Sequence, residues 1–166
     1  MPILPDLLVP NLKLVFCGTA ASIIAAREKA YYANPTNHFW RTVYQVGLTP
    51  HQFSPKEFPQ LLDYGIGLTD VSKDAKGNDV DLLKSDFDPE GFLQKMAEYQ
   101  PKVIAFTSKK AASIALKTTT GNLAYGLQAE KLEQSQVWIL TSPSGLARSY
   151  WDESVWQALA DFLGQL

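Results

Sequence analysis

The chain has 166 residues, of which 46% are hydrophobic and 19% are charged, and its formal net charge is −2. This size and composition fit one globular domain spanning residues 1–166, and no run approaches the roughly 18 consecutive apolar residues of a membrane span. The slight negative charge argues against a protein held on nucleic acid by bulk charge alone, although a local basic rim would suffice for binding.

Short apolar runs alternate with amphipathic stretches along the whole chain. In order, we expect a strand over residues 12–17, a loop over 19–35 with a helical turn at 23–29, a helix over 36–46, a short helix over 55–62, a strand over 66–71, a polar exposed loop over 73–87, a helix over 88–100, a strand over 103–107, a helix over 108–117, a loop over 118–130, a strand over 137–141, a loop over 142–150 and a helix over 152–163. Residues 1–12 contain three prolines and predict an irregular lead-in.

Local signals support these boundaries. Ser54 precedes Pro55 and Glu57, which is typical of a capped helix start. Residues 36–46 place Phe39, Trp40, Val43 and Tyr44 on one helical face. Strands that alternate with helices indicate a parallel sheet covered on both faces. We therefore predict an α/β fold, a three-layer α/β/α arrangement with a central, mostly parallel, four-stranded sheet.

Four pieces of sequence carry a resemblance to a known family. They are residues 16–18 (FCG), residues 34–40 (NPTNHFW) with 44–47 (YQVG), residues 65–69 (GIGLT) and residues 142–146 (SPSGL). In this order and spacing they resemble the mismatch-specific uracil/thymine-DNA glycosylases of the uracil-DNA glycosylase superfamily. The resemblance covers residues 12 to about 160 and implies a protein that flips a base out of damaged or mismatched DNA.

The same resemblance assigns roles in a base pocket. Gly18 and Thr19 would meet the carbonyl edge of the base, and Tyr32 would stack on its ring, the alternative being a tyrosine of the core. Ser142 stands where the family often has Asn. Ala20 is the main departure, because the family commonly has Asn there, and other branches of the superfamily have Asp, to position the attacking water.

A replacement for the missing polar group can be sought at the end of the second expected strand. Carboxyl ends of parallel strands share one rim of a sheet, so Asp70 and the turn at Gly18 can face one pocket. We expect Asp70 to orient water or to stabilise a cationic sugar, the alternative being a helix cap or a solvated loop acid.

The last motif resembles the loop that enters DNA in this family. Leu146 would fill the gap left by the flipped base, Gly145 would allow close approach, and Ser144, Ala147 and Arg148 would lie beside them. The alternative is an ordinary turn from strand to helix. Lys109 begins a helix and could meet a phosphate, or it could simply be solvated.

Two sets of residues carry no expected chemistry. Asn37 would fasten the loop that carries Tyr32, and His38 and His51 are too isolated to suggest a metal site. The single cysteine, Cys17, permits no internal disulfide, and residues 1–6 do not read as a signal peptide, so we expect a cytoplasmic location.

Taken together, the sequence favours a monofunctional DNA glycosylase that removes uracil from G·U mispairs, with single strands as an alternative context. Water would be the nucleophile, and we expect no cofactor, no metal and a monomer. A rival of the same fold would remove hypoxanthine or xanthine, and Ala20 supports a catalytically inactive DNA-damage-binding module. An unrelated α/β hydrolase or nucleotide-binding domain is disfavoured, since neither Gly-x-Ser-x-Gly nor a phosphate loop is present.

Overall fold

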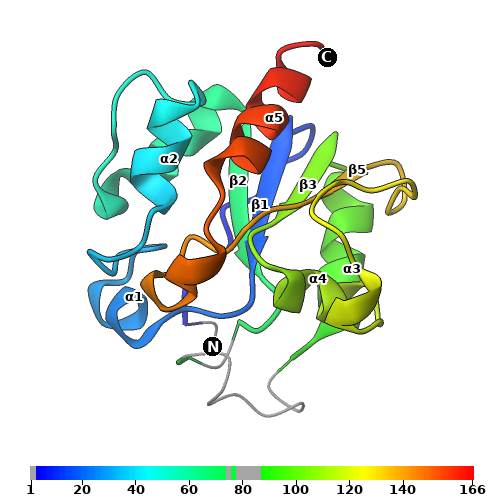
Figure 1. Ribbon diagram of the computed structural model, residues 1–166, viewed down its shortest axis with the longest axis horizontal. Helices are drawn as coiled ribbons and strands as arrows, with labels where there is room; N and C mark the ends of the chain where they lie inside the picture. Colours follow the sequence, from blue (N-terminus) through cyan, green and yellow to red (C-terminus); the bar gives the residue numbers. More distant parts are fainter. Residues whose placement is uncertain (1–2, 74–75, 78–86) are drawn as a thin grey trace.

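A five-stranded sheet forms the centre of the computed structural model, which describes residues 3–73, 76–77 and 87–166 (Figure 1). The strands are β1 (Leu14–Gly18), β2 (Ile66–Asp70), β3 (Val103–Phe106), β4 (Gly126–Leu127) and β5 (Gln136–Ile139), in the order β2-β1-β3-β5-β4. All neighbouring pairs are parallel except β4 with β5. The α/β prediction is therefore confirmed, and the sheet has one short antiparallel strand more than the sequence suggested.

The helical segments agree with the expected positions, with differences at their ends. They are α1 (Ile23–Glu28), α2 (Phe39–Gln45), η1 (Pro55–Tyr64), α3 (Pro89–Tyr99), α4 (Lys109–Ala115), η4 (Thr120–Asn122), η5 (Gly145–Tyr150) and α5 (Glu153–Leu163). Side-chain caps fix several of the starts: for example, Ser22 accepts from Ala25 N at 3.0 Å, Ser108 from Ala111 N at 3.1 Å, and Asp88 from Gly91 N at 2.9 Å.

Two details of the prediction were wrong. The helix expected from residue 36 begins at Phe39, because Asn34 and Asn37 hold the preceding residues in turns through their side-chain oxygens. Tyr44 is exposed rather than inward-facing. The short helix expected over 55–62 is present as a 3-10 helix over Pro55–Tyr64 that includes Pro59, and the expected pairing of Ser54 with Glu57 is also present.

Alternating side chains of the strands build two apolar cores, one on each face of the sheet. Leu14 and Phe16 of β1 face the core that contains Trp156 of α5. Val15 and Cys17 face the second core, which contains Met96 of α3 together with residues of α4. Figure 1 shows α2 and α5 on one side of the sheet and α3 and α4 on the other, which confirms the three layers.

Two further expectations concern the polar loop over residues 73–87 and the lead-in over residues 1–12. Most of the polar loop expected over 73–87 lies outside the described residues. The described part of the lead-in is irregular, as expected, apart from one isolated bridge in which Leu7 and Leu68 exchange backbone hydrogen bonds of 2.9 and 3.0 Å along the outer edge of β2. Among the helices that the structure describes, none combines the length and apolar character needed to cross a membrane.

Candidate active site

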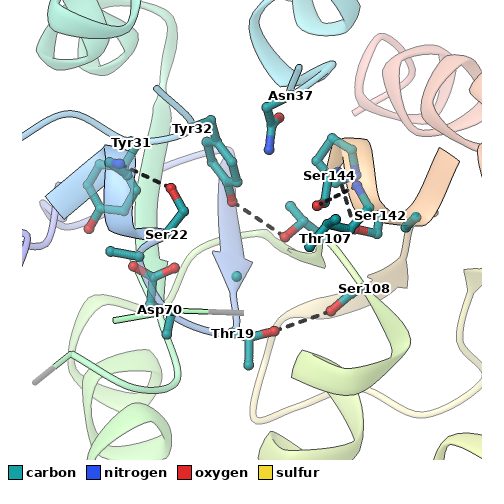
Figure 2. Close-up of a pocket in the computed structure, with 18 of the residues that line it drawn as sticks. Thr19, Ser22, Tyr31, Tyr32, Asn37, Asp70, Thr107, Ser108, Ser142 and Ser144 are labelled. Carbon is teal, nitrogen blue, oxygen red and sulfur yellow. Dashed lines mark hydrogen bonds between the residues drawn. The ribbon is translucent and has the colours of Figure 1, made fainter. Parts of the chain in front are cut away.

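A cavity of about 320 Å³ opens where the parallel strands β1, β2 and β3 end (Figure 2). Its walls come from segments that are distant in sequence: Leu4, residues 18–22, Ala25, Tyr31, Tyr32, Asn37, Asp70, Gly77, Thr107, Ser108, residues 142–144, Leu146 and Ala147. The carboxyl edge of a parallel sheet is the usual ligand site of such folds. The volume lies near the lower end of the roughly 300–1,000 Å³ of small-molecule pockets.

Asp70 and Gly18 meet on the cavity wall because they are paired in the sheet. The parallel register sets Gly18, the last residue of β1, against Asp70, the last residue of β2. A Cβ atom on Gly18 would lie 2.8 Å from Asp70 Oδ1, 3.3 Å from the Tyr32 hydroxyl and 3.5 Å from Thr107 Oγ1. Three polar groups therefore converge over the bare Cα of Gly18, and a side chain there would displace the Asp70 oxygen and crowd the Tyr32 hydroxyl.

The Asp70 carboxyl is buried, with 5% of its surface exposed. Burial raises its pKa above the usual 3.8, and the ammonium group of Lys73, 3.4 Å from Oδ2, opposes that rise. Burial, together with the Asp70 charge, also raises the pKa of Tyr31 and of Tyr32, so both phenols stay neutral and can donate hydrogen bonds. The site therefore holds one titratable acid among neutral polar groups.

Tyr32 presents one face of its ring to the cavity. Its hydroxyl lies 3.4 Å from Thr107 Oγ1, and Phe39 stacks on the ring with centroids 4.0 Å apart and planes 16° apart. Trp40 Nε1 donates to the Tyr31 carbonyl at 2.9 Å, which holds the loop against α2. Tyr32 has a φ of +53°, a conformation that is rare for a bulky residue and typical of functional sites. A planar ligand could stack only on the face opposite Phe39.

The turn after β1 offers little side-chain chemistry. Thr19 Oγ1 lies 3.5 Å from Ser108 Oγ, and Ala20 lines the cavity without a polar side-chain atom. The Ser22 hydroxyl is already engaged in capping α1. Because these hydroxyls are weak bases, Asp70 is the acid–base group that the cavity offers among the described residues.

The loop over residues 142–148 forms the opposite wall. Ser142 Oγ accepts from Ser144 N at 3.3 Å, and Ser144 Oγ accepts from Leu146 N at 3.2 Å, so both hydroxyls shape the loop. Leu146 lines the cavity and is 77% exposed, which leaves an apolar side chain standing in solvent at the mouth. Ala147 lines the cavity beside it.

Gly145, Arg148 and Lys109 do not line the cavity. A Cβ atom on Gly145 would lie 2.5 Å from Thr36 Oγ1, so this glycine is needed for packing within the protein. Arg148 is exposed. Burial is the main cause of the lowered pKa of His38, and the positive charges of Arg41 and Arg148 lower that pKa further. The Lys109 ammonium group lies 4.4 Å from the centre of the Tyr125 ring.

Sequence reasoning missed several members of the site. Asn37 does fasten its loop, since its Oδ1 accepts from Phe39 N at 2.9 Å, but Figure 2 shows its amide also directed into the cavity. Thr107 follows directly after β3, a position that the shared carboxyl edge of the sheet could have flagged. Lys73 and its partner Asp6 gave no sequence signal, because their meeting depends on long-range packing.

The geometry of the cavity indicates a class of protein. A cavity large enough for one flat heterocycle, lined by a buried carboxyl, a stacking phenol and small residues, suits an α/β enzyme that acts on such a ligand. Among residues 3–73, 76–77 and 87–166, no group of three or more His, Cys, Asp or Glu side chains is placed to hold a metal ion.

The chain belongs to the uracil DNA glycosylase superfamily, because the model of that family matches residues 5–163. Among solved structures, the chain is similar to a candidate uracil DNA glycosylase from Methanosarcina acetivorans, determined in solution by NMR. The two share 24% sequence identity and a TM-score of 0.69, over 97% of this chain and 96% of the other. At this identity the likeness concerns the fold.

Proposed function

We propose that the chain is a monofunctional DNA glycosylase that hydrolyses the N-glycosidic bond of a deaminated base, with uracil in G·U mispairs as its first substrate. The observation that carries the proposal is the meeting of Asp70 Oδ1 and the Tyr32 hydroxyl over Gly18, inside a cavity sized for one base. Membership of the superfamily supports it, and the motifs at residues 34–40 and 142–146 favour the mismatch-specific branch.

The proposed reaction uses the cavity as a receptor for an extrahelical base. The base stacks on the open face of Tyr32, and the Asn37 amide donates to its edge. The bond between C1′ and the base nitrogen breaks, its electron pair leaves with the base, and the sugar becomes cationic. A water oxygen then bonds to C1′, a carboxylate takes up the proton that this water loses, and the base leaves as an anion that is protonated when the carboxyl gives that proton up.

Asp70 takes the part that Ala20 cannot play in this scheme. Its carboxylate orients the water, accepts its proton and offsets the positive charge on the sugar. Hydrolysis rather than strand cleavage is favoured because, among the described residues, no lysine lines the cavity to form a Schiff base.

The exposed loop supplies the contact with DNA in this proposal. Leu146 enters the space vacated by the flipped base and offsets the lost stacking, and Arg148 meets a phosphate beside it. Lys109 is the first residue of α4 and follows Ser108, which lines the cavity. Its positive charge adds to the same rim of the cavity. Such a local basic rim compensates for the net charge of −2.

A second substrate class has one observation in its favour. Ala20 and Ala21 line the cavity with the smallest side chains, which leaves room for a fused two-ring base such as hypoxanthine or xanthine. The choice between uracil and a deaminated purine is therefore decided by product analysis.

The test is single-turnover release of free base from duplexes that contain one uracil or one hypoxanthine. Wild type, Asp70→Asn and Asp70→Ala are compared, with Asp63→Asn as a matched control because Asp63 is an exposed acid away from this cavity. We expect release by wild type and by Asp63→Asn, and a loss of about a hundredfold or more in both Asp70 variants.

Two other outcomes would contradict the proposal at different points. Release that survives both Asp70 substitutions would refute the catalytic role of this carboxyl. Binding of damaged duplex without release of any base by the wild type would refute the enzymatic function and favour a damage-binding module.

A further inference from the structure

Lys73 links the proposed catalytic carboxyl to a second carboxyl outside the cavity. Its ammonium group lies 3.4 Å from Asp70 Oδ2 and 3.2 Å from Asp6 Oδ1, and it donates a hydrogen bond of 2.8 Å to the Tyr31 hydroxyl. The side chain is only 12% exposed and does not line the cavity. One buried cation thus serves two acids, only one of which faces the proposed substrate.

Asp6 is held in place by its own set of contacts. Thr69 Oγ1 donates to Asp6 Oδ1 at 2.7 Å, and the Lys95 ammonium group lies 2.6 Å from Oδ2. The backbone around Asp6 is fixed as well, because the Tyr31 hydroxyl donates to the Pro5 carbonyl at 3.0 Å and Leu7 pairs with β2. These contacts hold the Asp6 carboxyl at a fixed distance from the Asp70 carboxyl, so the negative charge of Asp6 always acts on Asp70.

We propose that Lys73 is a positioning residue that keeps the Asp70 carboxylate charged and turned toward Gly18, and that Asp6 competes for the same ammonium group and limits its effect. The inference rests on the proposed function, since it assigns Asp70 its working state. Lys73 holds Oδ2, which leaves Oδ1 beside the Cα of Gly18, where the cavity begins.

The physical basis is the cost of a buried charge. A carboxylate removed from water needs a nearby cation, and an opposite charge within about 4–6 Å typically lowers an acid's pKa by about 1–3 units. Lys73 and Lys95 lower the pKa of Asp70, with Lys73 the stronger, whereas Asp6 raises it. Cys17, Tyr31 and Tyr32 also face Asp70, but burial raises the pKa of each, so they stay neutral.

This arrangement predicts shifts of opposite sign from two neighbouring substitutions. Lys73→Met should raise the pKa of Asp70, and Asp6→Asn should lower it. A residue that merely supports the fold would not reverse the sign in this way.

The experiment measures single-turnover base release as a function of pH for Lys73→Met, Lys73→Arg and Asp6→Asn, with Lys56→Met as an exposed control. We expect the acid limb of the profile to move up by one pH unit or more in Lys73→Met, to move down in Asp6→Asn, and to stay near wild type in Lys73→Arg and Lys56→Met. The carboxyl carbon of Asp70, titrated by NMR in the same proteins, should move in the same directions.

The NMR titration separates failure of this inference from failure of the proposed function. If no base is released by any protein, the titration still reports whether Lys73 and Asp6 set the charge of Asp70. An unchanged Asp70 titration in a folded Lys73→Met protein would overturn the inference, and so would a shift of the same sign in Asp6→Asn. If Lys73→Met does not fold, Asp6→Asn still decides the question through the sign of its shift.

Discussion

Replacing Gly18 by Ala is the most direct perturbation of the site geometry. The new Cβ would lie 2.8 Å from Asp70 Oδ1, whereas carbon–oxygen contacts settle at roughly 3.3–3.6 Å. The carboxylate must therefore retreat by about 0.5 Å or more, against the hold of Lys73 on its other oxygen. The Tyr32 hydroxyl would lie 3.3 Å from the same Cβ, which is also a tight contact.

Gly18→Ala should lower both the rate of base release and the stability of the fold. A misplacement of about 1 Å can cost around a hundredfold in rate, so we expect single-turnover base release to fall about 10- to 100-fold. Overpacking costs about 1–3 kcal/mol, which corresponds to a melting temperature lower by about 2–12 °C in a chain of this size. Gly121→Ala is the control, since nothing lies within 4 Å of its added Cβ, and it should leave both quantities unchanged.

A double-mutant cycle assigns the loss to Asp70. If Gly18→Ala acts by displacing that carboxylate, adding it to Asp70→Asn should cause no further loss of base release. Wild-type release by Gly18→Ala, or losses that multiply in the double variant, would refute the reasoning that the carboxyl must stand beside Gly18 to work.

Two further predictions test the mouth of the cavity and the charge within it. Leu146→Ala should leave the free energy of unfolding within about 0.5 kcal/mol of wild type, because the side chain is exposed. Base release from duplex DNA should fall, whereas release from single strands should not, because only a duplex needs a wedge. Equal losses from both substrates would argue against a wedge. Asp70→Asn should melt at or above the wild-type temperature at pH 7. The raised pKa means that this carboxyl favours the folded state fully only below pH 3.8 and loses that contribution as pH rises through its folded pKa. The advantage of the Asn variant should therefore vanish near pH 3 in thermal melts, and a variant clearly less stable than wild type at pH 7 would contradict the raised pKa.

Local patterns in the sequence determined most of the fold. Ser22, Asp88 and Ser108 cap helix starts by accepting a hydrogen bond from the backbone N–H three residues later. Such caps can be predicted without any knowledge of packing, because they are local in sequence. The buried strands β1 and β3 are short apolar runs, which the sequence shows directly. The two-residue β4 escaped prediction because its pairing with β5 comes from chain proximity rather than from a pattern of its own.

The same reasoning reached part of the site. Parallel strands end at one edge, and this rule alone brought Gly18 and Asp70 to the same rim, where the register pairs them directly. The sequence also marked Ala20 as a gap in the usual chemistry, since the absence of a polar side chain at one position is visible without a structure.

What surrounds Asp70 was decided only by the tertiary structure. The Tyr32 hydroxyl meets Thr107 across 75 positions of sequence, and Thr69 meets Asp6 across 63. Such contacts depend on how loops cross the end of the sheet, which no local spacing encodes. Lys73 lies in a stretch that reads as a polar surface loop, yet packing buries it between two carboxyls. The charge and direction of the proposed catalytic group therefore follow from burial and from an ammonium group that the distant Asp6 also holds, because these arise only when separate segments pack together around Asp70.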